Sequence, residues 1–554
     1  MEPVFDRSKS GAWSASRGSL RLHSAYDPAA EAERFLDTAL GEKKPPLVIL
    51  SGACLDYLSP ALRSRLKGST ILSLQFDPAF RVRGPRAELG LAPGPLPGDT
   101  RFAEHFPDEG DLASFLGARL DEDLASGLCC LEWPPAVRAY PEEAERTARA
   151  LRAAVDKVVS SAATLKVFGA SWFANACRSF LLTESLAEPG RLGGPIVLAA
   201  AGPSLEEALE DLEPYRGRFR LVVVSSAFAA VRARGFEADL VVATDGGFWS
   251  RAHLYPMAAA ASGYEEAAVR EGDGKAAAPI ASPLSALPSA CLSGGASLLL
   301  LEQDGFPERE LAAALGGGLQ VPSHGTVSGT ALSLACLLSD GSPILCAGFD
   351  FAALDVRGHA GPHGFDRFLD GAASRLAPGE VRAYARGRAE APNPLAGGPW
   401  RSSRSLATYA ASLGAEALSA RRGGGLYRLR PSPMAVGGLE TADAGLLGAI
   451  LDGPALPPPA WRVRGAPPLS AREAALSRLF AASRLAARRA AEALSGGALP
   501  EDPRARELCR TLDLPDWAAA RRAVILGGDP RPAASALEAS LLGQLESLEG
   551  RLLR

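Results

Sequence analysis

The sequence lacks any hydrophobic run long enough to cross a membrane. Its longest apolar stretches fall well short of the roughly 18 residues that a membrane-spanning helix requires. The opening segment, MEPVFDRSKSGAWSASRGSL, also has no apolar core of the kind found in secretory signal peptides. With neither signal in the sequence, we expect a cytoplasmic protein without a membrane span.

An excess of charge of either sign is lacking as well. The formal net charge is -4, and charged residues make up 22% of the chain. Proteins that bind nucleic acid usually contain a strongly basic domain, so we expect no nucleic-acid partner. The eight cysteines form no CxxC pair, and most of them lie in apolar runs. We therefore expect buried free thiols, with neither a disulfide framework nor a metal site.

What the chain does have is length and apolar residues. Its 554 residues, of which 47% are hydrophobic, suffice for several cores. We predict an α/β protein with a central Rossmann-like, mostly parallel sheet covered by helices on both faces, a smaller N-terminal α/β domain and a C-terminal helical domain. The predicted divisions are 1–140 (N-terminal domain), 141–194 (helical connector), 195–440 (central domain), 441–468 (Pro-rich linker) and 469–554 (helical domain).

Four nearly continuous apolar runs predict the strands of the central sheet. They are IVLAA, LVVVSS, DLVVATD and PILCAGFD, at residues 196–200, 221–226, 239–245 and 343–350. Strands buried on both faces of a parallel sheet have this composition. Between the third and fourth runs, the Ala-, Ser-, Gly- and Pro-rich stretch 258–295 is predicted to be mostly loop. In the N-terminal domain, the runs at 47–50 and 70–77 predict a βαβ unit.

A sharp turn follows the first of these strands, in the segment AAAGPSLEEAL. Gly202, Pro203 and Ser204 stand between the strand and the next helix. The spacing of Ser204 and Glu207 fits an ordinary helix cap, which contributes about 1 kcal/mol. Alternatively, free N–H groups and the positive end of the helix dipole bind a phosphate here, with Gly202 admitting the ligand to the backbone. The local sequence leaves both interpretations open.

Small and polar residues recur at the carboxyl ends of the predicted strands, among them Ser226, Asp245 and Asp350. Ligands of doubly wound sheets bind outside those ends, so we expect these residues to line one pocket. A second glycine-bearing helix start, in SHGTVSGTALSLACLL, predicts either a further cradle for an anion or a sugar, or only a helix cap. Its candidate residues are Thr326, Ser328, Gly329 and Thr330.

Two of the six histidines lie in the segment DVRGHAGPHGFD, after the fourth strand. His359 and His363 are candidate general bases because imidazole has an unperturbed pKa of about 6.5 and exchanges its proton near neutral pH. The alternative is a pair of solvated loop histidines. A metal site is disfavoured, since no third ligand has helical spacing with them.

Taken together, these motifs resemble the motility-associated factor (Maf) flagellin glycosyltransferases, a superfamily that includes archaeal 6-hydroxymethylpterin diphosphokinase-like proteins. The motifs are GPSL, TDGG, SGTALSLACLL followed by AGFDF, and the later H-A-G. The segments LRLHSAYDPAAEAERFLD, FGASWFANACRSFLL and RLRPSPMAVGGLE also resemble parts of that family. The resemblance therefore extends over most of residues 20–440 and leaves out the C-terminal helices.

The central domain also resembles bacterial sialyltransferases, which use CMP-linked nine-carbon sugars. The resemblance implies that the GPS turn contacts the phosphate or ribose of CMP and that His359 is the base, with Asp245 and His363 as further catalytic candidates. The implied donor-binding residues are Gly202, Pro203, Ser204, Ser226, Asp245, Thr326, Ser328, Gly329, Thr330 and Asp350.

One position departs from the sialyltransferase pattern. Those enzymes have a Tyr two residues after the SG pair to support the leaving phosphate, whereas this chain has Ala331. Stabilisation of the leaving group must therefore differ here.

The resemblance implies transfer of a pseudaminic- or legionaminic-like nonulosonic acid from a CMP-activated donor to Ser or Thr of flagellin, in flagellar assembly and motility, without an obligatory cofactor. One alternative is an ATP-dependent diphosphokinase acting on 6-hydroxymethylpterin, which would need Mg²⁺ held by carboxylates such as Asp245 and Asp350. Another is a non-catalytic nucleotide-binding scaffold for flagellin, which the alanine at position 331 would permit.

Overall fold

The computed structural model describes residues 2–81, 103–105, 109–117, 120, 127–188, 190–247, 250–254, 278–287, 291–292, 296–303, 305–420 and 425–553. The chain forms two compact units, Met1–Gly169 with Ala482–Glu546, and Ala170–Ala481 with Ser547–Arg554. Each unit has a hydrophobic core of its own. No helix in the described part of the chain combines the length and the apolar character that crossing a bilayer requires.

The first unit contains a parallel sheet in the order β6-β5-β4-β7 and a small antiparallel sheet β1-β2-β3. The predicted βαβ unit is confirmed, because β4 and β5 pair in parallel and α2 connects them. The strands are β1 (Val4–Arg7), β2 (Trp13–Arg17), β3 (Leu20–Arg21), β4 (Leu47–Ser51), β5 (Thr70–Gln75), β6 (Ala103–His105) and β7 (Leu128–Glu132).

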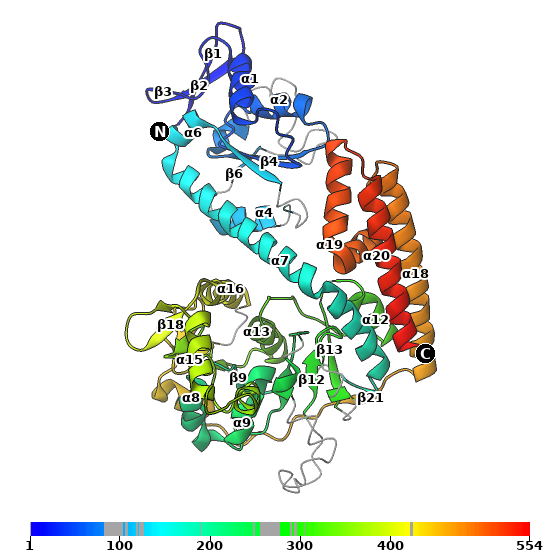
Figure 1. The fold of residues 1–554 in the computed structure, drawn as a ribbon. Helices are drawn as coiled ribbons and strands as arrows, with labels where there is room; N and C mark the ends of the chain where they lie inside the picture. Colours follow the sequence, from blue (N-terminus) through cyan, green and yellow to red (C-terminus); the bar gives the residue numbers. More distant parts are fainter. Residues whose placement is uncertain are drawn as a thin grey trace. The chain divides into compact units, whose positions relative to one another are not determined.

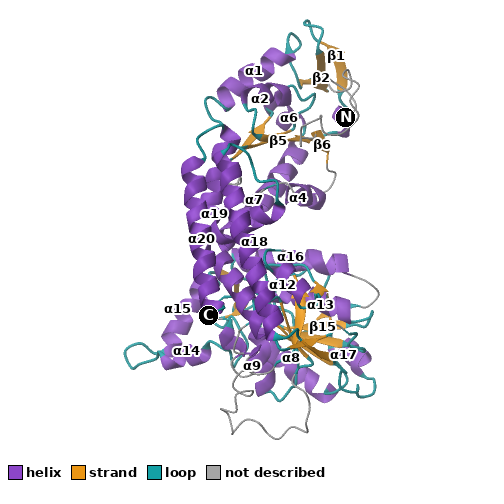
Figure 2. Cartoon of the chain, turned by 90° about the vertical axis from the view of Figure 1, so that its right-hand side faces the viewer, coloured by secondary structure: helices purple, strands orange, loops and turns teal. Residues whose placement is uncertain are grey.

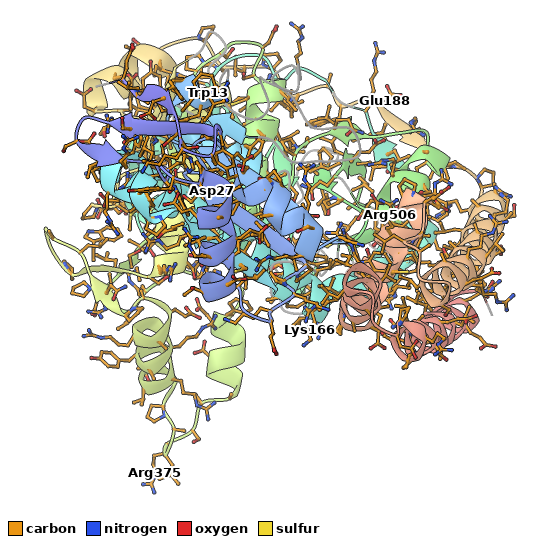
Figure 3. The ribbon with its side chains drawn as sticks, turned by 90° about the horizontal axis from the view of Figure 1, so that it is seen from above. Trp13, Asp27, Lys166, Glu188, Arg375 and Arg506 are labelled. Carbon is orange, nitrogen blue, oxygen red and sulfur yellow. The ribbon has the colours of Figure 1, made fainter. Side chains whose placement is uncertain are left out.

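Helices cover the sheet of the first unit, and the C-terminal helices predicted from the sequence are confirmed as α18–α20. Helix α1 begins where it does because the Asp27 carboxylate, labelled in Figure 3, accepts the N–H groups of Ala29 and Ala30. The helices that lie wholly in this unit are α1 (Pro28–Ala39), α2 (Leu58–Arg65), η1 (Pro78–Arg81), α4 (Glu109–Gly117), α6 (Pro134–Ala139) and α19 (Pro503–Leu526). The helices with residues in both units are α7 (Pro141–Leu182), α18 (Leu469–Ser495) and α20 (Arg531–Leu552).

The second unit is built on a large, mostly parallel sheet in the order β20-β19-β15-β9-β10-β11-β12-β13-β8-β21, with β14 beside β13. Only the pairing of β21 with β8 is antiparallel among the described strands of this sheet. The strands are β8 (Ser185–Ala187), β9 (Ile196–Ala199), β10 (Arg220–Val224), β11 (Leu240–Val242), β12 (Ile280–Ser282), β13 (Leu298–Glu302), β14 (Leu319–Gln320), β15 (Ile344–Ala347), β19 (Leu426–Arg428), β20 (Glu440–Thr441) and β21 (Val463–Gly465).

The four strands predicted for the central sheet are confirmed as β9, β10, β11 and β15, which are neighbours in the sheet and pair in parallel. Every residue of these strands is buried, which explains their uninterrupted apolar sequences. Within the stretch 258–295, predicted to be mostly loop, the structure contains β12, a three-residue strand too short to show a pattern in the sequence. The first part of that stretch, 258–277, lies outside the described residues.

Helices lie on both faces of this sheet, as predicted. Figures 1 and 2 show α13 and α16 on one face and α8 and α9 on the other. A small antiparallel sheet of β16 (Ala353–Leu354), β18 (Trp400–Ser402) and β17 (Asn393–Pro394) follows β15. The helices are α8 (Leu205–Leu212), η2 (Glu213–Tyr215), η3 (Ser225–Ala227), α9 (Phe228–Ala233), α12 (Glu308–Ala314), α13 (Val327–Leu338), α14 (Asp366–Gly371), α15 (Gly379–Glu390), α16 (Arg404–Ala420) and α17 (Ala444–Leu451).

The domain boundaries given by the sequence stay a prediction. Within residues 441–468, predicted to be a linker, the structure contains helix α17 and strand β21. Leu451 at the end of α17 is fully buried in the core of the second unit, so this part of the range packs against the sheet domain.

The close packing around Gly348 can be tested by comparing it with Gly341, a nearby glycine with open space around it. Gly348 and Gly341 both have positive φ (+70° and +81°), so alanine at either position is strained by roughly 1–2 kcal/mol. A Cβ at position 348 would also lie 2.1 Å from the carbonyl oxygen of Ala200, whereas position 341 is open. We expect Gly348→Ala to lower the free energy of unfolding by roughly 2–5 kcal/mol and Gly341→Ala by roughly 1–2 kcal/mol. Chemical denaturation measures the free energy of unfolding of both variants. Equal losses of stability would contradict the close approach of the Ala200 carbonyl to position 348.

Candidate functional site

The central sheet reverses its direction of growth between β9 and β15. From β9 the chain adds β10, β11, β12 and β13 on one side, and it then returns to place β15 on the other side. In open parallel sheets, ligands bind outside the carboxyl ends of the strands at such a switch point. The turn after β9 contains Gly202, and the turn after β15 contains Gly348 and Asp350. The structure thus brings two of the predicted motifs to one place.

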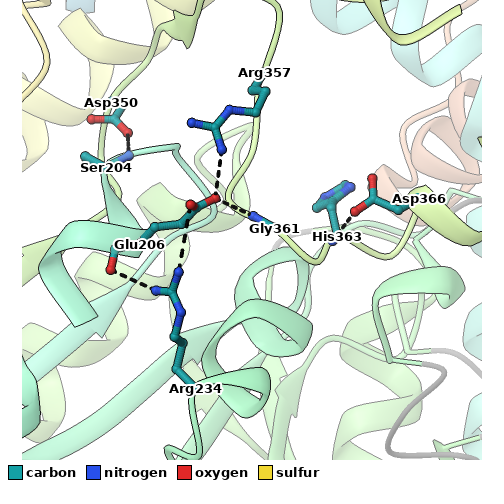
Figure 4. A network of polar contacts seen from close by, with 8 residues as sticks. All are labelled: Ser204, Glu206, Arg234, Asp350, Arg357, Gly361, His363 and Asp366. Carbon is teal, nitrogen blue, oxygen red and sulfur yellow. Dashed lines mark hydrogen bonds and ion pairs between the residues drawn. The ribbon is translucent and has the colours of Figure 1, made fainter. Parts of the chain in front are cut away.

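Two hydrogen bonds join the turns that follow β9 and β15. The Gly202 N–H donates to the carbonyl oxygen of Gly348 over 2.9 Å, and the Ser204 N–H donates to Oδ2 of Asp350 over 2.8 Å (Figure 4). A Cβ on residue 202 would lie 2.4 Å from both acceptor oxygens. Glycine is therefore required at position 202 because the carboxylate and the neighbouring backbone approach it closely.

Asp350 is a buried acid whose side chain supports this junction. It is only 1% exposed, and burial raises the pKa of its carboxyl, while the Ser204 N–H and the Arg428 guanidinium lower it. Arg428 is also buried, which lowers its own pKa. Its guanidinium donates to Ser432 Oγ over 2.9 Å, and that hydroxyl donates to the Asp350 carbonyl over 2.6 Å. The switch point is therefore a buried polar network.

Helix α8 does not begin with the side-chain cap that the sequence suggested at Ser204. Ser204 stands at the N-cap position, but its side chain makes no capping hydrogen bond, so the prediction of a Ser204 side-chain cap is wrong. The acceptor is instead the Asp350 carboxylate, 146 residues later in the chain, which no local pattern contains. Pro203 and Ser204 are buried, and the Leu205 N–H donates to the Gly202 carbonyl. A phosphate bound at this helix start would compete with Asp350 for the Ser204 N–H, and donor binding by Gly202, Pro203 and Ser204 stays a prediction.

The second glycine-bearing helix start is capped as its sequence allows. Thr326 is the N-cap of α13, and its Oγ1 accepts the Gly329 N–H over 3.1 Å. Because α13 leads directly into β15, which runs parallel to β9, its first turn lies toward the carboxyl edge of the sheet. The helix packs on the opposite face from α8 (Figures 1 and 2). Thr330 and Gly329 are buried and Ser328 is half-buried, and their contact with a donor stays a prediction.

Three histidines gather beside the switch point, and one of them was not predicted. The rings of His359 and His363 stack with centroids 4.1 Å apart and an interplanar angle of 13°. His253 lies on the other side of His363, with a centroid separation of 4.9 Å, and Phe365 contacts both. The alternative of two solvated histidines is wrong for His363, which is buried, whereas His359 is exposed.

Burial keeps the histidine cluster uncharged near neutral pH. Desolvation, with help from His359 and His253, lowers the pKa of His363 to about 2. Desolvation also lowers the pKa of His253 to about 4, against a small upward effect from Asp245. The atoms crowded around His359 lower its pKa as well, and Arg386 adds to this, while Glu390 and Asp366 act in the opposite direction. His359 is therefore a neutral imidazole with an exposed surface, which is the form that accepts a proton.

The remaining predicted residues lie at the ends of neighbouring strands. Asp245 is exposed, follows β11 by three residues, and its Oδ1 accepts the Gly247 N–H over 2.8 Å. Ser226 is half-buried in the short turn η3, directly after β10. Throughout the described ranges, no group of three or more His, Cys, Asp or Glu side chains has an arrangement that could hold a metal ion. The roles of Ser226 and Asp245 stay predictions.

Sequence reasoning missed two residues that shape this site, His253 and Glu206. His253 follows the strand-end Asp245 by eight residues. The expectation that ligands bind outside the carboxyl ends of the strands, which pointed to Asp245, could therefore have pointed to His253 as well. Glu206 lies in the first turn of α8, where an acidic residue is explained by the helix dipole alone. Its long-range contacts with Gly361 and Arg357 are visible only in the fold (Figure 4).

The buried histidines predict a loss of stability in acid. In the unfolded chain His363 titrates near pKa 6.5, whereas in the folded protein its pKa is about 2, so the unfolded state binds more protons below pH 6.5. The free energy of unfolding therefore falls as the pH decreases, by roughly 3 kcal/mol per such histidine between pH 7 and pH 4. We expect His363→Phe, which keeps an uncharged ring, to make unfolding less dependent on pH in denaturation curves at pH 7 and pH 5. An unchanged dependence would mean that His363 is protonated in the folded protein.

Comparison with known proteins gives one sequence relative and one similar structure. No family model matches the chain. An uncharacterized protein of Treponema pallidum (strain Nichols) is 27% identical over 264 residues. That match covers 46% of this chain and 54% of the other protein, so the chain spans about half the length of the curated relative it matches.

The similar structure is that of the MAf glycosyltransferase from Magnetospirillum magneticum AMB-1. The TM-score is 0.58 at 11% sequence identity, and the match covers 100% of this chain and 91% of that protein. At 11% sequence identity, the similarity between the two structures shows a shared fold alone. The chain therefore has the fold of the MAf glycosyltransferase along its whole length.

Proposed function

We propose that this protein is a glycosyltransferase that transfers a nonulosonic acid, pseudaminic- or legionaminic-like, from a CMP-activated donor to Ser or Thr hydroxyls of flagellin. The full-length likeness to a MAf glycosyltransferase supports the general class. The observation that carries the proposal is the neutral, exposed imidazole of His359, stacked on His363 beside the switch point of the sheet. The donor and acceptor follow from the resemblance of the sequence motifs to flagellin glycosyltransferases and sialyltransferases.

The chemistry is a single displacement at the anomeric carbon of the sugar. The acceptor hydroxyl oxygen forms a bond to that carbon, and the bond to the phosphate oxygen breaks with its electron pair leaving on CMP. His359 takes the proton of the attacking hydroxyl, a contribution typically worth 10²–10⁴ in rate. Because attack and departure occur on opposite sides of the carbon, the reaction inverts its configuration.

Support for the departing phosphate must come from groups other than a tyrosine at position 331. Ala331 is fully buried in α13, and the Ser204 N–H at the start of α8 already donates to Asp350. Arg357 is a cation two residues before His359, and its side chain is 54% exposed. We therefore add Arg357 to the proposed site as a group that stabilises the negative charge on CMP.

Ligand binding distinguishes this proposal from the diphosphokinase alternative. We expect CMP to raise the thermal stability of the protein, since a ligand at 100 times its Kd adds about 2.7 kcal/mol to the free energy of unfolding. ATP with Mg²⁺ at the same concentration is expected to have a smaller effect, because its Kd for this site would be higher. The measurement is a thermal shift with each ligand, and stabilisation by ATP and Mg²⁺ alone would contradict the proposal.

Replacement of the proposed base tests turnover. We expect His359→Ala to lower the rate of sugar transfer by on the order of 10²–10⁴ while CMP still stabilises the fold. Because the pKa of His359 is lowered, the wild-type rate should hold as the pH falls to 6.5 and decline only below it. The readouts are the mass of flagellin incubated with donor and enzyme, and the rate as a function of pH. Unchanged flagellin glycosylation by the variant would exclude His359 as the base, and glycosylation without the protein would indicate a scaffold.

A further inference from the structure

We propose that Glu206 is a positioning residue that holds the His359 segment, defined as residues 357–365, against the turn between β9 and α8. This inference rests on the proposed function for its catalytic meaning, because the segment carries the proposed base. The geometric part of the inference, that the Glu206 carboxylate fixes this segment, stands on contacts alone.

The His359 segment is attached to the sheet through two successive N–H groups directly after His359. The Ala360 N–H donates to the Ala201 carbonyl over 2.8 Å, and the Gly361 N–H donates to Oε1 of Glu206 over 2.8 Å. The Ala201 carbonyl lies in the turn after β9, and Glu206 lies in the first turn of α8. The position of the His359 backbone is thus set by the same turn that carries Gly202 and Ser204.

The Glu206 carboxylate is held in place by two cations. Arg357, at the start of the segment, approaches Oε1 at 3.3 Å, and Arg234, after α9, approaches Oε2 at 3.8 Å (Figure 4). Arg234 also donates to the backbone carbonyl of Glu206 over 2.8 Å. The glutamate side chain is 23% exposed, so these interactions are only partly screened by water. One carboxylate therefore ties together α8, the end of α9 and the His359 segment.

The far end of the segment is fixed by packing. A Cβ on Gly364 would lie 2.8 Å from the Ala252 carbonyl, and the neighbouring His253 packs against His363. The segment is therefore pinned at Gly364 by close backbone packing and at Gly361 by the Glu206 hydrogen bond. Removing the Glu206 carboxylate weakens the attachment of the end at which His359 lies, where the Ala360 N–H still donates to the Ala201 carbonyl. A shift of about 1 Å in a catalytic group can slow a reaction 10²-fold, so the position of the segment matters for transfer.

The neighbouring glutamate supplies a matched control. Glu207 carries the same charge on the same turn of α8, but its side chain is 66% exposed and approaches Arg430 at 3.7 Å. Glu207→Ala therefore removes one acidic charge from the helix start without touching the His359 segment. Glu206→Asp retains the charge and shortens the side chain by one methylene, so that it no longer reaches the Gly361 N–H.

The experiment is hydrogen exchange by mass spectrometry on the full chain, followed in peptides that contain residues 357–365. We expect Glu206→Ala and Glu206→Asp to increase exchange in these peptides roughly five- to tenfold, the factor that loss of one hydrogen bond allows. Glu206→Gln keeps an acceptor oxygen and should stay close to the wild type, as should Glu207→Ala. Unchanged exchange in Glu206→Asp, or an equal increase in Glu207→Ala, would overturn the inference.

Transfer kinetics supply the second readout. We expect Glu206→Asp to lower kcat on the order of tenfold or more and to change the KM for the donor less, because the base is displaced while the donor site keeps its residues. A change in KM alone would overturn the positioning role. If the wild-type protein transfers no sugar, the proposed function fails, while the exchange measurement still decides whether Glu206 holds the segment.

Discussion

The buried carboxylate of Asp350 links the two strands between which the central sheet changes direction. Its Oδ2 accepts the Ser204 N–H at the start of α8, and the same region of backbone allows only glycine at position 202. An ionisable group with 1% exposure is unfavourable unless it is paired, and here the Ser204 N–H and the nearby Arg428 guanidinium provide that compensation. The geometry of the turns after β9 and β15, which carry Gly202, Ser204 and Gly348, follows from this junction.

The histidine cluster shows how the fold brings together uncharged imidazole rings from residues far apart in the chain. His253 follows β11, whereas His359 and His363 follow β15, and their rings meet beside the switch point. Burial disfavours the charged imidazolium and lowers the pKa of all three, and the neighbouring histidines lower the pKa of His253 and His363 further. The exposure of His359 alone distinguishes it within the cluster as the group that an incoming hydroxyl could reach.

The helix starts of α8 and α13 look alike in sequence and differ in structure. Thr326 caps its own helix through its hydroxyl, as its local sequence allows, whereas Ser204 leaves that role to Asp350. A local motif could therefore predict that each helix begins there, but it could not predict which group satisfies the first N–H. For the proposed transfer reaction this difference matters, since an N–H group already paired with a carboxylate is a weaker site for the phosphate of a leaving group.

The sequence by itself determined the strands β9, β10, β11 and β15 and the helices around them, because apolar runs and glycine-bearing turns are local signals of burial and of chain reversal. It also indicated Asp245, Asp350, His359 and His363 as chemically important. Only the tertiary structure decided that His253 joins the histidines, that Asp350 caps α8, and that Glu206 holds the Gly361 N–H. These contacts connect residues from about 110 to 155 positions apart. Such pairings depend on the order of the strands in the sheet. Strand order produces no periodicity or residue spacing that can be recognised in the sequence.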